Sequence, residues 1–402
     1  MIGDNNIKIK QLMLLIILII PGGKYLSLPI VMARGIGRDS PYACLILFAI
    51  DLLMLLCIVW ALNLNTYRKS VYEIISSTLS PIVAKIIMGI FALFLLVRLS
   101  YLMVYSIDIF SSTFSIKTNW LAFIIPVAIA VIFMISRGMT AVARLAQILF
   151  AFIIIAQLTM LILSIPQTDI GNLQPVLDKG IGGVLRKLPD YTLWYGDCLI
   201  LLFFADCIPK NEEKYGILVA GFGISAAICI GLSVVYIGLF GSYAKYNNLA
   251  MSKVSQFIIQ QTTLGRLDWL MLVIWSVSVL IKIVMFSFCC MRSINHILNI
   301  TTQIGKYISL IAVMVIIVVL PLLTDVKQLV SDAFSTGWGK YVFWVCQYLL
   351  PPLLPLLVCR TNKREQADNN IILNSKSKLK KLVDGDAQQQ TNMADSIMRG
   401  QP

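Results

Sequence analysis

The stretch IIPGGKYLSLP, residues 19–29, interrupts a segment that is otherwise apolar enough to cross a lipid bilayer. A spanning helix needs about 20 mostly apolar residues. This one carries a proline, two glycines and a lysine near its centre (Pro21, Gly22, Gly23 and Lys24). Non-helical backbone at membrane depth survives only where it lines a cavity or meets a ligand. The stretch therefore predicts a binding site, and an ordinary kink repaired by neighbouring helices is the alternative.

The composition is that of an integral membrane protein. Of the 402 residues, 58% are hydrophobic and 13% are charged, whereas a soluble domain has roughly 25% charged residues. Period-two alternation is absent, so we predict an all-α protein and not a barrel. We predict ten membrane segments, at about 11–33, 41–63, 83–110, 119–136, 142–165, 191–208, 215–240, 269–291, 304–324 and 341–359.

The chain divides into a membrane domain, residues 1–360, and a polar tail, residues 361–402. The first apolar run has no small-residue cleavage site, so we expect it to be retained as a helix. Eight of the 33 Lys and Arg residues lie between Arg360 and Arg399, and the tail has no periodicity, so we expect a disordered cytoplasmic segment. Its basic charge fits anionic lipid headgroups better than nucleic acid.

Both termini are predicted to lie in the cytoplasm. The basic residues of the connections are balanced between the two sides, and the tail tips the balance toward the amino-terminal side. The two longest outer connections are 167–190 and 244–268. They have the amphipathic character of short surface helices, which could gate a pore or serve as ordinary loops.

A second interrupted segment stands at the place that corresponds to the first. When ten segments are divided into two fives, the first matches the sixth, which begins YTLWYGDCLILLFF with Tyr195, Gly196 and Asp197. Interrupted helices in matching positions indicate a five-plus-five inverted repeat with its site at mid-membrane. At the first break, Gly22 and Gly23 would offer free N–H groups to a carboxylate, and Lys24 adds positive charge.

The third segment carries a polar stripe. Arg98, Tyr101, Tyr105 and Asp108 are spaced by three, four and three residues, so they share one helix face. Charges at membrane depth are costly and usually face the bundle interior. For the two tyrosines we favour a cavity role. Arg98 and Asp108 could bind a substrate, or they could form a structural ion-pair network toward Asp51 or Asp197.

The eighth segment places a lysine near mid-bilayer. Trp275, Ser278, Lys282, Met285 and Cys289 share one face of this helix. The Lys282 ammonium needs a carboxylate or carbonyl partner, and it could be a proton carrier, a stand-in for a sodium ion or a paired structural residue. We expect Trp275 to help wall the binding site.

Nothing in the sequence supports an enzyme. The nine cysteines lie in apolar stretches without zinc spacing or a disulfide pattern. His296 is the single histidine, and no nucleophile-base pair or nucleotide motif accompanies it. We predict no cofactor, no metal site and no nucleic-acid partner.

Three motifs resemble a known family. They are Leu28-Pro29 after the first break, GRD at 37–39, and LGRLDWLMLVIWSVSVLIKI at 264–283. They are similar to the B subunits of spore germinant receptors, the GerAB type, over about residues 5–360. That family is similar to the amino acid-polyamine-organocation transporters, which have a LeuT-like fold. The resemblance places the breaks at Gly22–Gly23 and at Tyr195–Asp197.

The resemblance implies a membrane subunit of a germinant receptor. Such a subunit senses a small germinant, commonly an amino acid, together with A and C subunits in the spore inner membrane. We therefore expect a small zwitterion at the two breaks, with Asp197 or a nearby carbonyl at its ammonium. A proton- or ion-coupled amino-acid permease and a conducting pore, alone or as an oligomer, are the alternatives.

Overall fold

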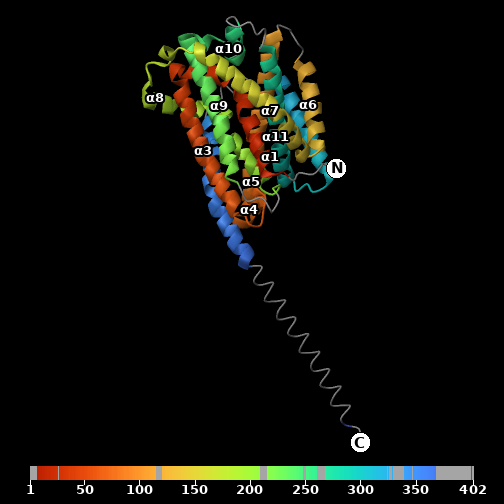
Figure 1. Cartoon of the computed structure of the whole chain (residues 1–402). Coiled ribbons are helices and arrows are strands. Elements are labelled where there is room, and N and C mark those ends of the chain that lie inside the picture. Colours follow the sequence, from red (N-terminus) through yellow and green to blue (C-terminus); the bar gives the residue numbers. More distant parts are fainter. Residues whose placement is uncertain are drawn as a thin grey trace.

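The computed structural model confirms an all-α membrane protein (Figure 1). It describes residues 7–25, 27–114, 120–208, 215–247, 250–259, 268–323, 339–345 and 347–367, with the single positions 325, 328 and 400. These residues contain no β-strand.

The chain forms long apolar helices joined by short ones. Among the residues that the structure describes, seven helices are long and apolar enough to span a membrane, and a bent pair adds an eighth candidate. The α-helices are α1 (Ile9–Lys24), α2 (Leu28–Gly35), α3 (Ser40–Leu64), α4 (Val71–Thr78), α5 (Pro81–Phe114), α6 (Trp120–Ser136), α7 (Met139–Ser164), α8 (Gly180–Lys187), α9 (Ile217–Phe240), α10 (Ala250–Ile259), α11 (Asp268–Ile297), α12 (Gln303–Leu323) and a last helix, Gly339–Ala367.

The first predicted segment is the bent pair. Helices α1 and α2 meet at an angle of 50°. The break begins after Lys24, so the prediction that it falls on Gly22 and Gly23 is wrong. Both glycines lie in the last turn of α1, where the absence of a Cβ lets this helix approach α11. A Cβ on Gly22 would stand 2.8 Å from the Ser278 Cβ.

The second half of the bend is set by proline. Pro29 lies in the first turn of α2, where a missing N–H costs nothing. Ser27 joins the two helices, since its N–H donates to the Lys24 carbonyl and its hydroxyl donates to the Gly23 carbonyl. These bonds satisfy main-chain oxygens that the end of α1 leaves without helical partners.

The sixth predicted segment is broken where expected. It consists of two 3₁₀ helices, η4 (Leu188–Trp194) and η5 (Asp197–Phe204), and not of an α-helix. Gly196 joins them with a φ of +74°, a left-handed conformation that glycine adopts without steric cost. Its N–H donates to the Asp51 carboxylate at 2.8 Å.

Part of the packing agrees with the division into two fives. Three helices of the first half pack on their counterparts in the second: α3 on α9, α5 on α11 and α6 on α12. The broken elements α1 and η5 also contact each other. This pattern agrees with two repeated halves whose interrupted members meet at the centre, whereas the inversion of one half stays a prediction.

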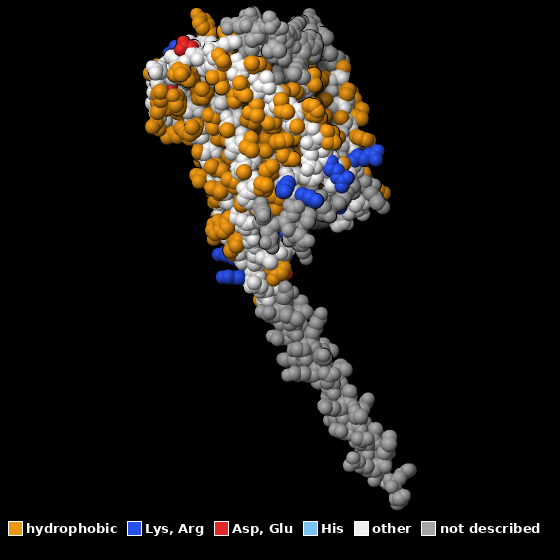
Figure 2. Space-filling model, in the orientation of Figure 1, with side chains coloured by type: hydrophobic (Ala, Val, Ile, Leu, Met, Phe, Trp, Pro, Cys, Tyr) orange, Lys and Arg blue, Asp and Glu red, His pale blue; other side chains and the backbone are white. Residues whose placement is uncertain are grey.

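The two ends of the bundle differ. Figure 1 shows α8 and α10 at one end, which we call the outer end, and α4 at the opposite, inner end. Both long outer connections contain a short helix, as predicted. Figure 2 shows hydrophobic side chains over most of the visible described surface, and α6 and α7 expose large ones such as Phe133 and Phe152. That surface suits a lipid environment.

The last helix runs past the boundary predicted at residue 360. It reaches Ala367, and most of the predicted tail lies outside the described residues. The division at residue 360 and the disorder of the tail therefore stay predictions.

Candidate functional site

Four buried charged side chains meet where the two broken elements touch. The Asp197 carboxylate at the start of η5 is bound by Lys24 at 2.5 Å, by Arg98 at 2.5 Å and by Lys282 at 2.9 Å. These cations come from α1, α5 and α11. None of the four side chains is more than 5% exposed. We call this group the Asp197 cluster.

Aromatic rings surround the cations of the cluster. The Arg98 guanidinium carbon lies 4.8 Å from the centre of the Phe286 ring, and the Lys24 ammonium lies 5.4 Å from that of Tyr195. Cation–π attraction is strongest when water is excluded, as it is here. The rings therefore help to hold positive charge in a dry interior.

A second carboxylate lies beside the cluster. Asp51 of α3 accepts the Gly196 N–H and, at 3.0 Å, the Tyr348 hydroxyl of the last helix. Of the two partners considered for Arg98, the structure selects Asp197 and not Asp51. Asp108 lies on the same helix but not among the residues that contact Asp197.

The buried charges do not balance. Three cations face Asp197, and Asp51 supplies the one other carboxylate among the described residues next to them. A buried charge is stable only when it is paired and hydrogen-bonded. With all three cations protonated and both carboxylates ionised, the cluster carries one excess positive charge, which either an anionic group from outside the chain or the loss of a proton from a lysine would remove.

A small cavity lies against the cluster. Its volume is about 20 Å³, room for about one water molecule. Its lining includes Gly23, Arg98 and Lys282 together with the rings of Tyr101 and Trp194. Tyr101 stacks on Tyr105 with ring centres 5.9 Å apart, and the Trp194 ring centre lies 5.7 Å from each of theirs. In this conformation the space is too small for an amino acid.

Of the residues predicted to bind the ligand, Trp275 lies in another part of the bundle, and Tyr195 turns its hydroxyl toward α3. Trp275 lines a separate apolar cavity of about 190 Å³ with Phe110 and Phe123, because it stands two helical turns from Lys282 on α11. Tyr195 is fully buried and turned toward α3, where its hydroxyl meets the Cys44 sulfur at 3.3 Å.

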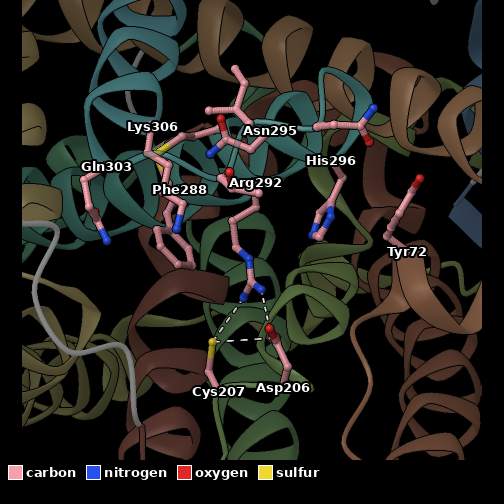
Figure 3. A pocket seen from close by; sticks show the side chains of 13 residues that line it. Tyr72, Asp206, Cys207, Phe288, Arg292, Asn295, His296, Gln303 and Lys306 are labelled. Atoms are coloured by element: carbon pink, nitrogen blue, oxygen red, sulfur yellow. Dashed lines mark hydrogen bonds and ion pairs between the residues drawn. The ribbon is translucent and has the colours of Figure 1, made fainter.

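A large cavity lies at the inner end. Its volume is about 570 Å³, and α11 and the segment after it form much of its wall. Figure 3 shows Arg292 reaching Asp206 and Cys207, just beyond η5, and His296 next to Tyr72. The two rings stack with centres 4.9 Å apart. Asp206 and Cys207, which line this cavity, follow the end of the element whose first residue is Asp197.

Comparison with known proteins identifies the family. A family model described as "Spore germination protein" matches residues 6–326. The chain belongs to the spore germination protein family. This confirms the resemblance that the three motifs carry.

The curated relatives of this spore germination protein share limited identity with it. Spore germination protein XB of Bacillus anthracis is 22% identical over 317 residues, 76% of this chain and 83% of the relative. Spore germination protein YndE of Bacillus subtilis (strain 168) is 22% identical over 237 residues, 58% of this chain and 63% of the relative. Spore germination protein A2 of the same organism is 21% identical over 180 residues, 44% of this chain and 49% of the relative.

The sequence analysis of this spore germination protein did not predict that the last helix contacts the break at Gly196. Gln347 is 1% exposed, and its amide packs so closely on Gly196 that a Cβ there would lie 2.2 Å from the Gln347 Cδ. Neither amide atom has a hydrogen-bond partner among the described residues. The adjacent polar pair Gln347-Tyr348 in an otherwise apolar segment was the available signal.

Proposed function

We propose that this spore germination protein is the membrane subunit of a germinant receptor that binds a small zwitterionic nutrient, such as an amino acid, at the Asp197 cluster. The observation that carries the proposal is the excess of buried cations at the meeting point of two broken elements. A nutrient carboxylate provides a second anionic partner beside Arg98 and Lys282. Its ammonium takes the place of a lysine at Asp197.

Binding of this kind is coupled to a change of shape. The cavity at the cluster has to enlarge before a nutrient fits, so the nutrient favours a more open conformation of the broken elements. The A and C subunits then respond to this conformational change. We propose that the complex lies in the spore inner membrane and that it can form oligomers.

A permease is the second candidate. The observation that favours it is Lys282, a buried ammonium 2.9 Å from Asp197, which could carry a proton or replace a sodium ion during transport. Uptake of labelled amino acids into proteoliposomes that contain this chain alone would support transport. Co-purification of A and C subunits, with nutrient binding and no uptake, would support the receptor.

The proposed function is tested with spores that lack this gene. A panel of amino acids, sugars and nucleosides is applied, and germination is followed by the loss of optical density. We expect the response to one class of nutrient to disappear and to return when the gene is restored. An unchanged response to every nutrient would contradict the assignment.

The cavity wall can be tested at Tyr101. Replacing Tyr101 with Ala removes the ring that faces both Arg98 and Trp194. We expect the nutrient concentration for half-maximal germination to rise about tenfold, since a buried aromatic contact contributes on the order of 1 kcal/mol or more. Phe133→Ala, which removes a ring that is 56% exposed on α6, is the control and should leave the response unchanged.

The close approach of α1 and α11 predicts different outcomes for the two glycines. A Cβ at Gly23 would stand 2.8 Å from the Lys282 ammonium, the mobile end of a long side chain. We expect Gly23→Ala to keep the folded protein but to displace Lys282 from Asp197, which raises the half-maximal nutrient concentration about tenfold. Gly22→Ala meets the Ser278 backbone and should instead lower the amount of folded protein.

The control for both glycines is Gly223→Ala in α9, where an added Cβ meets nothing within 4 Å. Germination at the wild-type nutrient concentration in Gly23→Ala spores would contradict the role given to Lys282.

A further inference from the structure

A second charged cavity lies at the outer end of the bundle, away from the Asp197 cluster. Its volume is about 330 Å³, and it lies where the end of α2, the turn at Asp178–Lys179 and the 3₁₀ helix η6 (Gly241–Tyr246) meet. Four cationic side chains line it: Arg34, Arg38, Lys179 and Lys245. We call it the outer basic pocket.

The hydrogen bonds of these cations leave their charge uncancelled. Arg34 donates to the carbonyls of Lys245 and Asn247 at 3.0 and 2.9 Å. Arg38 donates to the Gln174 carbonyl and the Ser242 hydroxyl, both at 2.8 Å. These acceptors are neutral, and each guanidinium has further N–H donors.

The two lysines of the pocket also have only uncharged partners. The Lys179 ammonium donates to the Gly35 carbonyl at 3.2 Å. The Lys245 ammonium lies 4.9 Å from the centre of the Tyr246 ring. Neither lysine forms an ion pair with any described residue.

Nearby carboxylates offset only part of this charge. Asp178 lines the pocket. Asp39 is 1% exposed, and its two oxygens accept the main-chain N–H groups of Asp178 and Lys179 at 3.1 and 3.0 Å. Asp39 thus fixes the turn that presents Lys179. The pocket keeps two more positive than negative charges.

We propose that the outer basic pocket binds one small oxyanion, a phosphate or carboxylate group. Planar guanidinium groups match the paired oxygens of such anions, and charge-assisted hydrogen bonds are the strong ones. A concave site of one sign also concentrates the counter-ion. The group can belong to a free anion or to a lipid headgroup at the outer surface, and the proposal is independent of nutrient binding at the centre.

The test uses the purified full-length protein in nanodiscs of two compositions. In zwitterionic lipid, inorganic phosphate is titrated at constant ionic strength, and its ³¹P line broadening is measured. In a second set, phosphatidylglycerol is added without free phosphate, and retained lipid is counted by native mass spectrometry. Saturable phosphate binding indicates a free-anion site, whereas retention of phosphatidylglycerol alone indicates a lipid site.

Three variants separate the pocket from general surface charge. Arg38→Gln should weaken binding at least tenfold. Lys245→Gln should weaken it about threefold, and it breaks no hydrogen bond that holds the pocket together. Arg186→Gln removes an exposed cation of α8 at the same end and should change nothing. Equal losses in all three variants, or no binding of either probe, would overturn the proposal.

Discussion

Replacing Asp197 with Asn is expected to remove most of the folded protein from the membrane. The change keeps the shape of the side chain but leaves Lys24, Arg98 and Lys282 without the carboxylate that each of them contacts. Breaking a buried ion pair from one side costs about 3–5 kcal/mol, a large share of a typical folding free energy. The measurement is the amount of monodisperse protein in detergent and its midpoint of thermal unfolding.

Two further variants show whether charge is the cause. Adding Lys282→Met to Asp197→Asn removes one uncompensated cation and should recover part of the lost stability. Asp206→Asn removes a carboxylate that also pairs with an arginine, Arg292, but is 30% exposed, and should cost no more than about 1 kcal/mol. A double variant no more stable than Asp197→Asn would count against the charge argument.

Replacing Gly196 with Ala is expected to have the second largest effect. Two costs add, because Gly196 has a φ of +74° and an added Cβ would overlap the Gln347 amide. The left-handed conformation costs about 1–2 kcal/mol for a residue with a Cβ, and overpacking costs about 1–3 kcal/mol more. We expect a clear fall in thermal stability and loss of the nutrient response.

Gly37 provides a matched control for this change. Its φ is +77°, but a Cβ there meets nothing within 4 Å. Gly37→Ala should therefore show the conformational cost alone. Combining Gly196→Ala with Gln347→Ala should reduce the loss of thermal stability to a value close to that of Gly37→Ala. Equal stabilities of the two single variants would rule out the packing of Gln347 on Gly196.

The sequence predicted the class of protein and both breaks because these depend on local composition. Apolar length and the matching glycines were enough to find the segments that contain Lys24 and Asp197. The exact start of the first break was not predictable, since the glycines serve the approach of α1 to α11, a contact between distant parts of the chain.

Partner choice was also beyond local patterns. The sequence left open whether Arg98 binds a substrate or joins an ion-pair network toward Asp51 or Asp197, and in the fold it pairs with Asp197. Trp275 shares a helix face with Lys282, yet a distance of two turns puts it in another cavity. Helical periodicity predicts which face of a helix a residue lies on. Which cavity the residue lines also depends on the neighbouring helices at that height in the bundle.

The position of Lys24 has a mechanical consequence. It is the last residue before the hinge in the first span, and its counter-ion is the first residue after the hinge in the sixth. A movement of either broken element away from the other would separate the Lys24 ammonium from the Asp197 carboxylate in the buried interior of the bundle. Under the proposed function, a nutrient with both an ammonium and a carboxylate would replace one of these two charges, and its binding would allow the two elements to separate.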